Sequence, residues 1–292
     1  MIYELLLYLQ DLRLSAPDFV TELMLFVSSP LVYIALPFAF ASFFLWCVDR
    51  RKGEWIMMNM ATGMFLGHFL KIVFKNPRPW VVDDRIVPEE KALEGANGYS
   101  TPSGHSLTGV TGYGSVITLI RSRWAWIGLS ALILTIMFSR LYLGVHTLFD
   151  VVVSIVIALI LMAVNWVLIT KAHEGNDVQV TTVYLLAFIV MTFIWIAITD
   201  NLSDLLKYGG FMIGAILGRH MASAYVDYRP KMGSLSRTVG CLLIGWALTG
   251  ILFLIPYMMF EGDARYCIGG FLSSVCIFVL TPVILKRIGL LS

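Results

Sequence analysis

The chain has 292 residues, of which 58% are apolar and only 14% are charged, and its formal net charge is +2. A soluble globular domain usually has about 25% charged residues, so a mean hydropathy of +0.81 excludes an ordinary soluble domain. A net charge near zero gives no electrostatic support for nucleic-acid binding, and we expect no nucleic-acid partner. The lipid bilayer is the environment that this composition predicts.

Apolar runs of the length of a membrane span recur along the whole chain. A transmembrane helix needs about 20 mostly apolar residues, and the runs predict an all-α, polytopic transmembrane bundle of about nine spans. At the N-terminus, leucines at helical spacing within residues 2–13 predict a short interfacial helix that does not cross the membrane. The predicted spans are 24–48, 54–75, 105–121, 124–142, 149–170, 179–199, 205–225, 237–257 and 264–285.

The loop cations predict an orientation. Lysine and arginine in short loops favour the cytoplasmic side of a membrane, and with nine spans most of them fall in alternate loops. Those loops are predicted to be cytoplasmic, with the N-terminus and loops 76–104 and 143–148 on the other side. The cations concerned are Arg50, Arg51, Lys52, Arg121, Arg123, Lys171, Arg229, Lys231, Arg237, Lys286 and Arg287.

Three short polar motifs interrupt this apolar sequence, all on the predicted outer side. The first closes span two, the second opens span three, and the third joins spans four and five. They are therefore expected to meet at one membrane face, although they are far apart in the sequence. The motifs are Lys71-x6-Arg78-Pro79, Pro102-Ser103-Gly104-His105 and Ser139-Arg140-x5-His146-x3-Asp150.

The cations of these motifs suit a phosphate group. Phosphoryl transfer depends largely on positioning and on stabilising charge on the phosphate oxygens. Arg78 and Arg140 offer planar guanidinium forks, and Lys71 offers a compact charge. Ser103 and Gly104 precede a predicted helix start, where backbone N–H groups can face an anion.

The histidines and the carboxylate supply the remaining groups for phosphoryl transfer. His146 and Asp150 are four residues apart, so on a helix they would share a face. Asp150 could then accept from one imidazole nitrogen and leave the other as a nucleophile. His105 is suited to protonate the leaving alkoxide and then to activate water.

The three motifs, in this order, resemble the signature of the type 2 phosphatidic acid phosphatase superfamily, which includes lipid phosphate phosphatases and glucose-6-phosphatase. The resemblance covers roughly residues 68–155, and all its motif positions match. It implies a phosphohistidine at His146, acid catalysis by His105 and orientation of His146 by Asp150. It also implies phosphate binding by Lys71, Arg78, Ser103, Gly104 and Arg140, with no metal and no cofactor.

The predicted substrate is a membrane lipid phosphate monoester, and several classes remain open. The two spans before the first motif resemble the arrangement of sphingosine-1-phosphate phosphatases and glucose-6-phosphatase. The stretch 139–152 is most similar to the sphingosine-1-phosphate phosphatases, which makes a long-chain base 1-phosphate the first choice. Phosphatidic acid, isoprenyl pyrophosphate and a sugar phosphate such as glucose 6-phosphate are the enzymatic alternatives. A lipid-binding or transport protein is the non-enzymatic alternative. The site would face the periplasm of a bacterial inner membrane or the lumen of the endoplasmic reticulum.

The chain is expected to form one membrane domain with two parts. Residues 1–172 would be the catalytic core, and residues 173–292 would add further spans packed on it. In the second part, the glycines of 209–220 predict close helix packing. Arg219 and His220 lie inside the same predicted span, and we expect Arg219 to reach the interface or pair with Asp227. The sequence does not indicate an oligomeric state.

Overall fold

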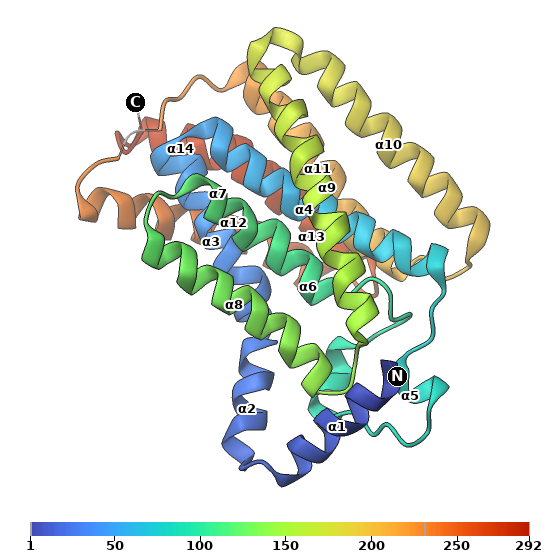
Figure 1. Ribbon diagram of the computed structural model, residues 1–292. Helices are drawn as coiled ribbons and strands as arrows, with labels where there is room; N and C mark the ends of the chain where they lie inside the picture. The colour runs from blue at the N-terminus through green and yellow to red at the C-terminus, as the bar shows by residue number, and fades with distance from the viewer. Residues whose placement is uncertain (1, 231, 292) are drawn as a thin grey trace. The chain divides into compact units, whose positions relative to one another are not determined.

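The computed structural model describes residues 2–230 and 232–291, and every regular element in these ranges is helical (Figure 1). The predicted all-α class is therefore confirmed. Lys231, one of the predicted cytoplasmic cations, lies outside the described residues. The chain forms two compact units that alternate along the sequence: Met1–Pro37 with Leu66–Leu161, and Phe38–Phe65 with Met162–Ser292. The predicted boundary at residue 172 stays a prediction.

The first unit contains the three polar motifs. The predicted N-terminal helix is present as α1, and α8 begins at the N-cap Ser122, whose hydroxyl accepts from the backbone N–H of Ala125. The unit also includes the last turns of α4 (Arg50–Phe74) and the first half of α9 (Leu148–Lys171). Its other elements are α1 (Ile2–Ser15), α2 (Asp18–Val27), η1 (Leu31–Ala35), α5 (Pro79–Val82), η3 (Glu90–Gly95), α6 (Gly104–Gly109), η4 (Val110–Gly114), α7 (Ser115–Leu119) and α8 (Arg123–Tyr142).

A small apolar core supports the third motif. It joins α2, the loop helix η3 and the turn after α8, and α2 lies against α8 (Figure 1). Because the chain between Arg140 and His146 packs into this core, the turn that carries the motif has a fixed course. The buried members are Met24, Ala92, Ala96, Tyr142, Leu143 and Val145.

The second unit is a set of long helices. It contains α3 (Leu36–Phe43) from Phe38 onward, η2 (Phe44–Val48), the N-terminal part of α4 and the C-terminal part of α9. The chain continues through η5 (Ala172–Asn176), α10 (Asp177–Ile198), α11 (Ser203–Tyr225), α12 (Leu235–Met259), α13 (Ala264–Val275), η6 (Cys276–Leu280) and α14 (Thr281–Arg287).

Glycines bring α11 and α13 into backbone contact, as the sequence predicts. A Cβ atom on Gly210 would lie 2.2 Å from the carbonyl oxygen of Cys267, and one on Gly214 would lie 2.6 Å from that of Phe271. No side chain fits in either place. Small residues at helical spacing are a common way for membrane helices to approach closely.

Several helices are long and apolar enough to cross a membrane, which supports a multi-pass protein, but the count of nine is not confirmed. Among the described residues six segments qualify by length and composition, and one of them contains both α9 and α10. Predicted span 105–121 is divided among α6, η4 and α7, and span 205–225 is α11, which carries Arg219 and several glycines. The segments are Asp18–Val48, Arg50–Val82, Arg123–Tyr142, Leu148–Ile198, Leu235–Met259 and Ala264–Arg287.

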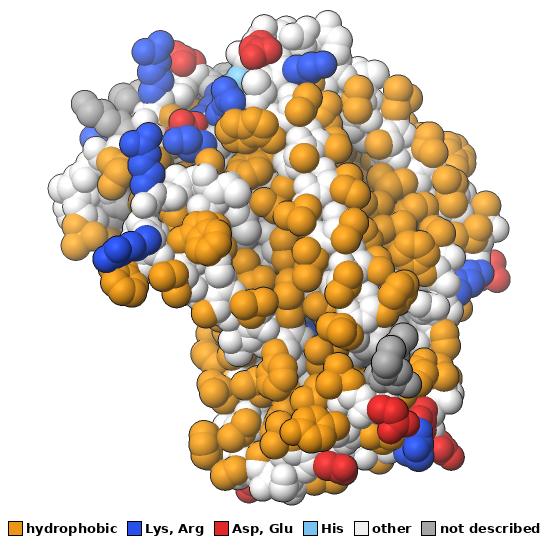
Figure 2. All heavy atoms as spheres, viewed as in Figure 1, with side chains coloured by type: hydrophobic (Ala, Val, Ile, Leu, Met, Phe, Trp, Pro, Cys, Tyr) orange, Lys and Arg blue, Asp and Glu red, His pale blue; other side chains and the backbone are white. Residues whose placement is uncertain are grey.

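The surface agrees with a lipid environment. In the face shown in Figure 2, hydrophobic side chains cover most of the area along the long helices. Exposed large apolar residues are frequent on α10, where Val178, Leu186 and Phe193 are exposed by 65%, 57% and 70%. Such a surface would be unfavourable in water and is the one that lipid chains solvate.

Candidate functional site

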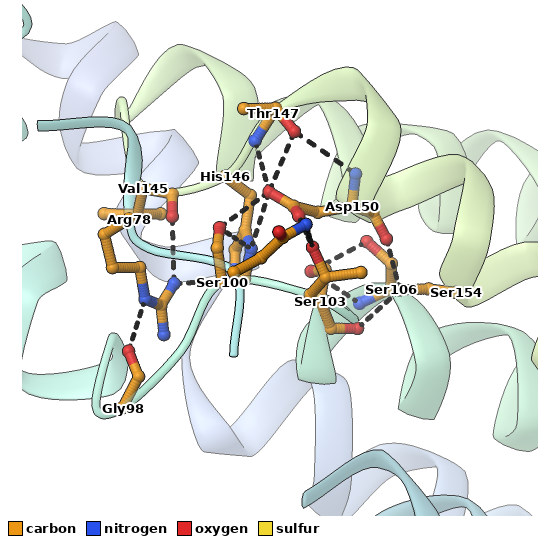
Figure 3. Close-up of polar contacts among 12 residues, drawn as sticks. Arg78, Gly98, Ser100, Ser103, Ser106, Val145, His146, Thr147, Asp150 and Ser154 are labelled. Carbon is orange, nitrogen blue, oxygen red and sulfur yellow. Dashed lines mark hydrogen bonds and ion pairs between the residues drawn. The ribbon is translucent and has the colours of Figure 1, made fainter. Parts of the chain in front are cut away.

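Arg78 connects the first motif to the loop before the second and to the third. Its Nε and Nη2 donate to the carbonyls of Gly98 (3.0 Å) and Asn97 (2.9 Å). Its Nη1 donates to the carbonyl of Val145 at 2.9 Å and lies 3.1 Å from Nε2 of His146 (Figure 3). Four of its five N–H groups are therefore in use. Arg78 organises the site, and it has fewer free donors than the sequence alone suggests.

His146 and Asp150 lie together, but not on one face of a helix. Helix α9 begins at Leu148, so His146 precedes it. The backbone N–H of Thr147 donates to Asp150 Oδ2 at 2.7 Å, and the N–H of Asp150 donates to Thr147 Oγ1 at 3.3 Å. This reciprocal pair is a capping box. It turns the chain so that His146 Nδ1 lies 3.5 Å from Asp150 Oδ2.

Asp150 receives two further hydrogen bonds, from residues that the motifs did not include. Ser100 Oγ donates to Oδ2 at 2.7 Å, and Thr101 Oγ1 donates to Oδ1. Ser100 Oγ also lies 3.5 Å from His146 Nδ1 (Figure 3). A carboxylate with this many donors is held in one orientation. The signal available in the sequence was two hydroxyl residues immediately before Pro102.

Arg140, in the third motif, has donors that no described residue uses. Its side chain is 2% exposed, and its Nε and Nη2 atoms have no hydrogen-bond partner among the described residues. Buried donors without an acceptor are costly. The two atoms form one edge of the guanidinium fork, which matches two oxygens of a phosphate. Lys71 is buried in the last turn of α4. The positive charges of Lys71 and Arg140 both interact electrostatically with the ring of His105.

The second motif begins helix α6. Ser103 is its N-cap, and the Ser103 hydroxyl accepts from the N–H of Ser106 at 3.5 Å. The N–H of Ser103 donates to the carbonyl of Asp150 at 3.4 Å, so this group does not point freely at an anion as the sequence predicted. The space beside Gly104 is open, because a Cβ there would meet no atom within 4 Å.

His105 is fully enclosed by residues of the same unit. Its Nε2 lies 3.1 Å from the carbonyl oxygen of Ser28, and its ring packs against that of Tyr33 with 4.0 Å between centroids and a tilt of 36°. A carbonyl can only accept, so Nε2 carries the proton in this bond. Nδ1 is then the nitrogen that remains for a leaving group. The predicted site residues thus lie within one compact unit.

Helix α1 holds the loop that precedes the second motif. Arg13 donates through Nη1 to the carbonyl of Tyr142 at 3.3 Å and through Nη2 to that of Val87. Gln10 accepts from the N–H of Val87 at 2.7 Å. Burial lowers the pKa of Arg13 from its ordinary value, while Glu89 acts in the opposite direction. The predicted interfacial helix therefore also anchors the loop whose end supplies Ser100 and Thr101.

Burial lowers the pKa of His146 well below its ordinary value of 6.5. The hydrogen bond with Asp150 acts in the opposite direction, and the positive charges of Arg78 and Arg140 lower the pKa further. The N–H of Arg78 that faces Nε2 also requires an unprotonated nitrogen there. His146 is therefore a neutral imidazole with its Nε2 lone pair directed toward Arg78.

This arrangement of two arginines, a lysine and a His–Asp pair accompanies a sequence match that covers the same residues. Residues 54–174 match the model of the PAP2 superfamily. Over these residues the chain resembles the PAP2 superfamily. The match includes all three motifs, and with it the predicted family resemblance is confirmed.

Relatives within the superfamily are similar at low identity. Sphingosine-1-phosphate phosphatase 1 of Rattus norvegicus is 25% identical over 144 residues, which cover 47% of this chain and 33% of the relative. Undecaprenyl-diphosphatase of Sulfolobus acidocaldarius is 33% identical over 106 residues, covering 35% of this chain and 48% of the relative. These matches span at most about half the length of either relative. No solved structure matches this chain.

Proposed function

We propose that this protein is an integral-membrane phosphatase of the PAP2 superfamily that hydrolyses a lipid phosphate through a phosphohistidine at His146. The observation that supports it best is Arg140, whose buried Nε and Nη2 atoms have no partner in the described chain. A phosphate oxygen on each would satisfy both. Lys71 and Arg78 would neutralise the remaining charge, so the reaction would need no metal ion.

In the first step, His146 Nε2 attacks the phosphorus atom. The N–P bond forms as the P–O bond to the alcohol breaks. The N–H of Arg78 that lies 3.1 Å from Nε2 must then turn to a phosphate oxygen, because the lone pair is no longer available. Asp150 stabilises the imidazolium through Nδ1, and Ser100 and Thr101 keep that carboxylate in place.

His105 serves both halves of the reaction. In its doubly protonated form, with the Nε2 proton held by the Ser28 carbonyl, it gives the second proton from Nδ1 to the leaving alkoxide, so that a neutral alcohol departs. It then takes a proton from a water molecule whose oxygen attacks phosphorus, and the N–P bond breaks to release phosphate and restore His146. The contacts with Ser28 and Tyr33 fix the ring for this role.

The first choice of substrate is a long-chain base 1-phosphate. The sphingosine-1-phosphate phosphatases of rat and mouse are similar to this chain over 144 residues at 25% and 24% identity. Spanning helices fit a substrate that reaches the site from the bilayer. The cationic loops predict that the site faces the periplasm or the lumen of the endoplasmic reticulum.

An isoprenyl diphosphate is the second candidate, because the undecaprenyl-diphosphatase match has the higher identity, 33%. The same cations would hold the outer phosphate, and the leaving group would be a phosphate monoester in place of an alcohol. Such a leaving group needs less protonation, so His105 would matter less for this substrate.

The test is phosphate release by the purified full chain in detergent with EDTA present. The panel contains a sphingoid base phosphate, a phosphatidic acid, an isoprenyl diphosphate and glucose 6-phosphate. We expect turnover of a lipid phosphate, inhibition by vanadate and loss of nearly all turnover in His146→Ala. Acid-labile, base-stable incorporation of ³²P into the wild type would identify the phosphohistidine.

Three outcomes would contradict the proposal. Wild-type turnover in His146→Ala would exclude His146 as the nucleophile. Loss of activity in EDTA that Mg²⁺ restores would exclude the metal-free mechanism. Binding of the lipids without phosphate release from any of them would favour the lipid-binding or transport alternative. Thr111→Val is a matched control, because the Thr111 hydroxyl in η4 donates to the carbonyls of Leu107 and Thr108 in the preceding turn, α6, and not to a proposed site residue among those described.

A further inference from the structure

The second unit contains a charged pocket that the phosphatase mechanism does not use. Its volume is about 290 Å³, at the lower end of small-molecule pockets. The start of α4, the η5 turn, the start of α10 and the end of α11 line it. The side chains that matter here are Arg50, Glu54, His173, Asp177, Arg219 and Ser223.

Both carboxylates of the pocket already have partners. Glu54 accepts from Arg50 Nε at 2.7 Å, and its other oxygen lies 2.9 Å from Nε2 of His173. Asp177 accepts from Arg219 Nη1 and lies against Nδ1 of His220. The prediction that Arg219 pairs with Asp227 is therefore wrong. Asp227 was chosen because it is close to Arg219 in the sequence, whereas Asp177 comes from the neighbouring helix α10.

One arginine that lines the pocket has a donor without an acceptor among the described residues. Arg219 is 1% exposed, its Nη2 donates to Thr181 at 2.8 Å, and its Nε has no partner among the described residues. Ser223 follows one helical turn later and also lines the pocket. The two arginines balance the two carboxylates of the pocket. A ligand with anionic oxygens is the one that completes this set of donors.

We propose that this pocket binds a phosphate group, either free phosphate or the headgroup of a phospholipid. A phosphate presents several oxygens, so one can accept from Arg219 Nε while another accepts from the Ser223 hydroxyl. The small volume admits a headgroup and excludes acyl chains, which would remain in the bilayer. The site is separate from the catalytic one and does not depend on the proposed phosphatase activity.

Binding is measured on a full chain in which the catalytic site is disabled by Arg140→Gln with His146→Ala. Equilibrium dialysis with ³²P-phosphate reports the free anion. Native mass spectrometry with phosphatidylglycerol, against diacylglycerol of the same acyl chains, reports the headgroup. Ser223→Leu fills the pocket without touching the two ion pairs. Its control is Ala224→Leu, at an exposed neighbouring position outside the pocket.

We expect Ser223→Leu and Arg219→Gln to weaken phosphate or phosphatidylglycerol binding by about tenfold or more, the loss of one hydrogen bond to a charged group. Ala224→Leu should bind as the background chain does. Retention in the dialysis arm identifies free phosphate, and retention of phosphatidylglycerol alone identifies a lipid headgroup. Equal binding in Ser223→Leu and Ala224→Leu, in both arms, would overturn the proposal even if Arg219→Gln does not fold.

Discussion

Nη1 of Arg78 lies 3.1 Å from Nε2 of His146, and the same nitrogen donates to the carbonyl of Val145. One arginine therefore fixes the course of the motif turn and the tautomer of the proposed nucleophile. Arg140, in contrast, has buried donors on Nε and Nη2 with no acceptor among the residues that the structure describes. The two arginines come from different motifs and were both predicted to bind phosphate, but their contacts differ.

This difference predicts how lysine substitutions will separate stability from turnover. Arg78→Lys loses the hydrogen bonds to Asn97, Gly98 and Val145 and should lower Tm by about 5 °C or more, along with activity. Arg140→Lys removes only a fork that we assign to phosphate. It should lower kcat/KM by about 100-fold and leave Tm nearly unchanged. Thermal unfolding and steady-state kinetics in the same detergent provide the comparison, and equal losses of Tm would contradict it.

Thr101→Val tests whether the hydroxyls before Pro102 position the catalytic pair. The change keeps the side-chain shape and removes one donor to Asp150, while Ser100 and Thr147 remain. We expect kcat to fall about tenfold with little change in KM, because Asp150 orients the nucleophile for the reaction step and does not bind the substrate. Steady-state kinetics against Thr111→Val measure this, and a change in KM alone would assign Thr101 to binding.

His105→Ala should show a loss that depends on the leaving group. With a lipid alcohol, no proton donor remains, and turnover should fall by about 100-fold or more. With an aryl phosphate, the phenolate leaves without protonation, so a ³²P-labelled phosphoenzyme should still form in a rapid-quench experiment. His146→Ala should form none with either substrate. Equal losses on both substrates would rule out the acid role.

The buried, neutral state of His146 predicts a pH dependence of stability. Its folded-state pKa is lowered, so between that pKa and 6.5 the unfolded chain binds a proton that the folded chain does not. Stability should therefore fall as the pH drops below 6.5, by about 1 kcal/mol at pH 5.5. Arg78, Arg140 and Asp150 are the charged groups that face this ring. In His146→Gln the drop in Tm between pH 7.5 and 5.5 should be smaller, and an equal drop would exclude this contribution.

Cysteine labelling tests the predicted orientation. Asp84 and Glu94 are exposed in the loop before the second motif, and Ser122 is exposed before α8. In a chain without its four native cysteines, Asp84→Cys and Glu94→Cys should react with an impermeant thiol reagent in intact bacteria or right-side-out vesicles. Ser122→Cys should be protected. The reverse pattern would place the site at the cytoplasmic face and make a cytosolic phosphate the substrate to test.

The sequence by itself determined the class of the protein and the groups that could form its site. Low charge and long apolar runs require a membrane helix protein, because no packing in water could cover that surface. Three motifs of fixed spacing placed Lys71, Arg140 and His146 among the candidate residues, because the residue types that bind and attack phosphate are few.

Only the tertiary structure decided how those groups are used. Ser100 and Thr101 hold Asp150 because the loop returns to α9, and no local spacing records that contact. Arg78 is largely occupied and Arg140 is open, although both are simply arginines in the sequence. Arg219 pairs with Asp177 across two helices. Local patterns determine which face a side chain takes, whereas burial and the partners available at that depth determine which donors remain for a ligand.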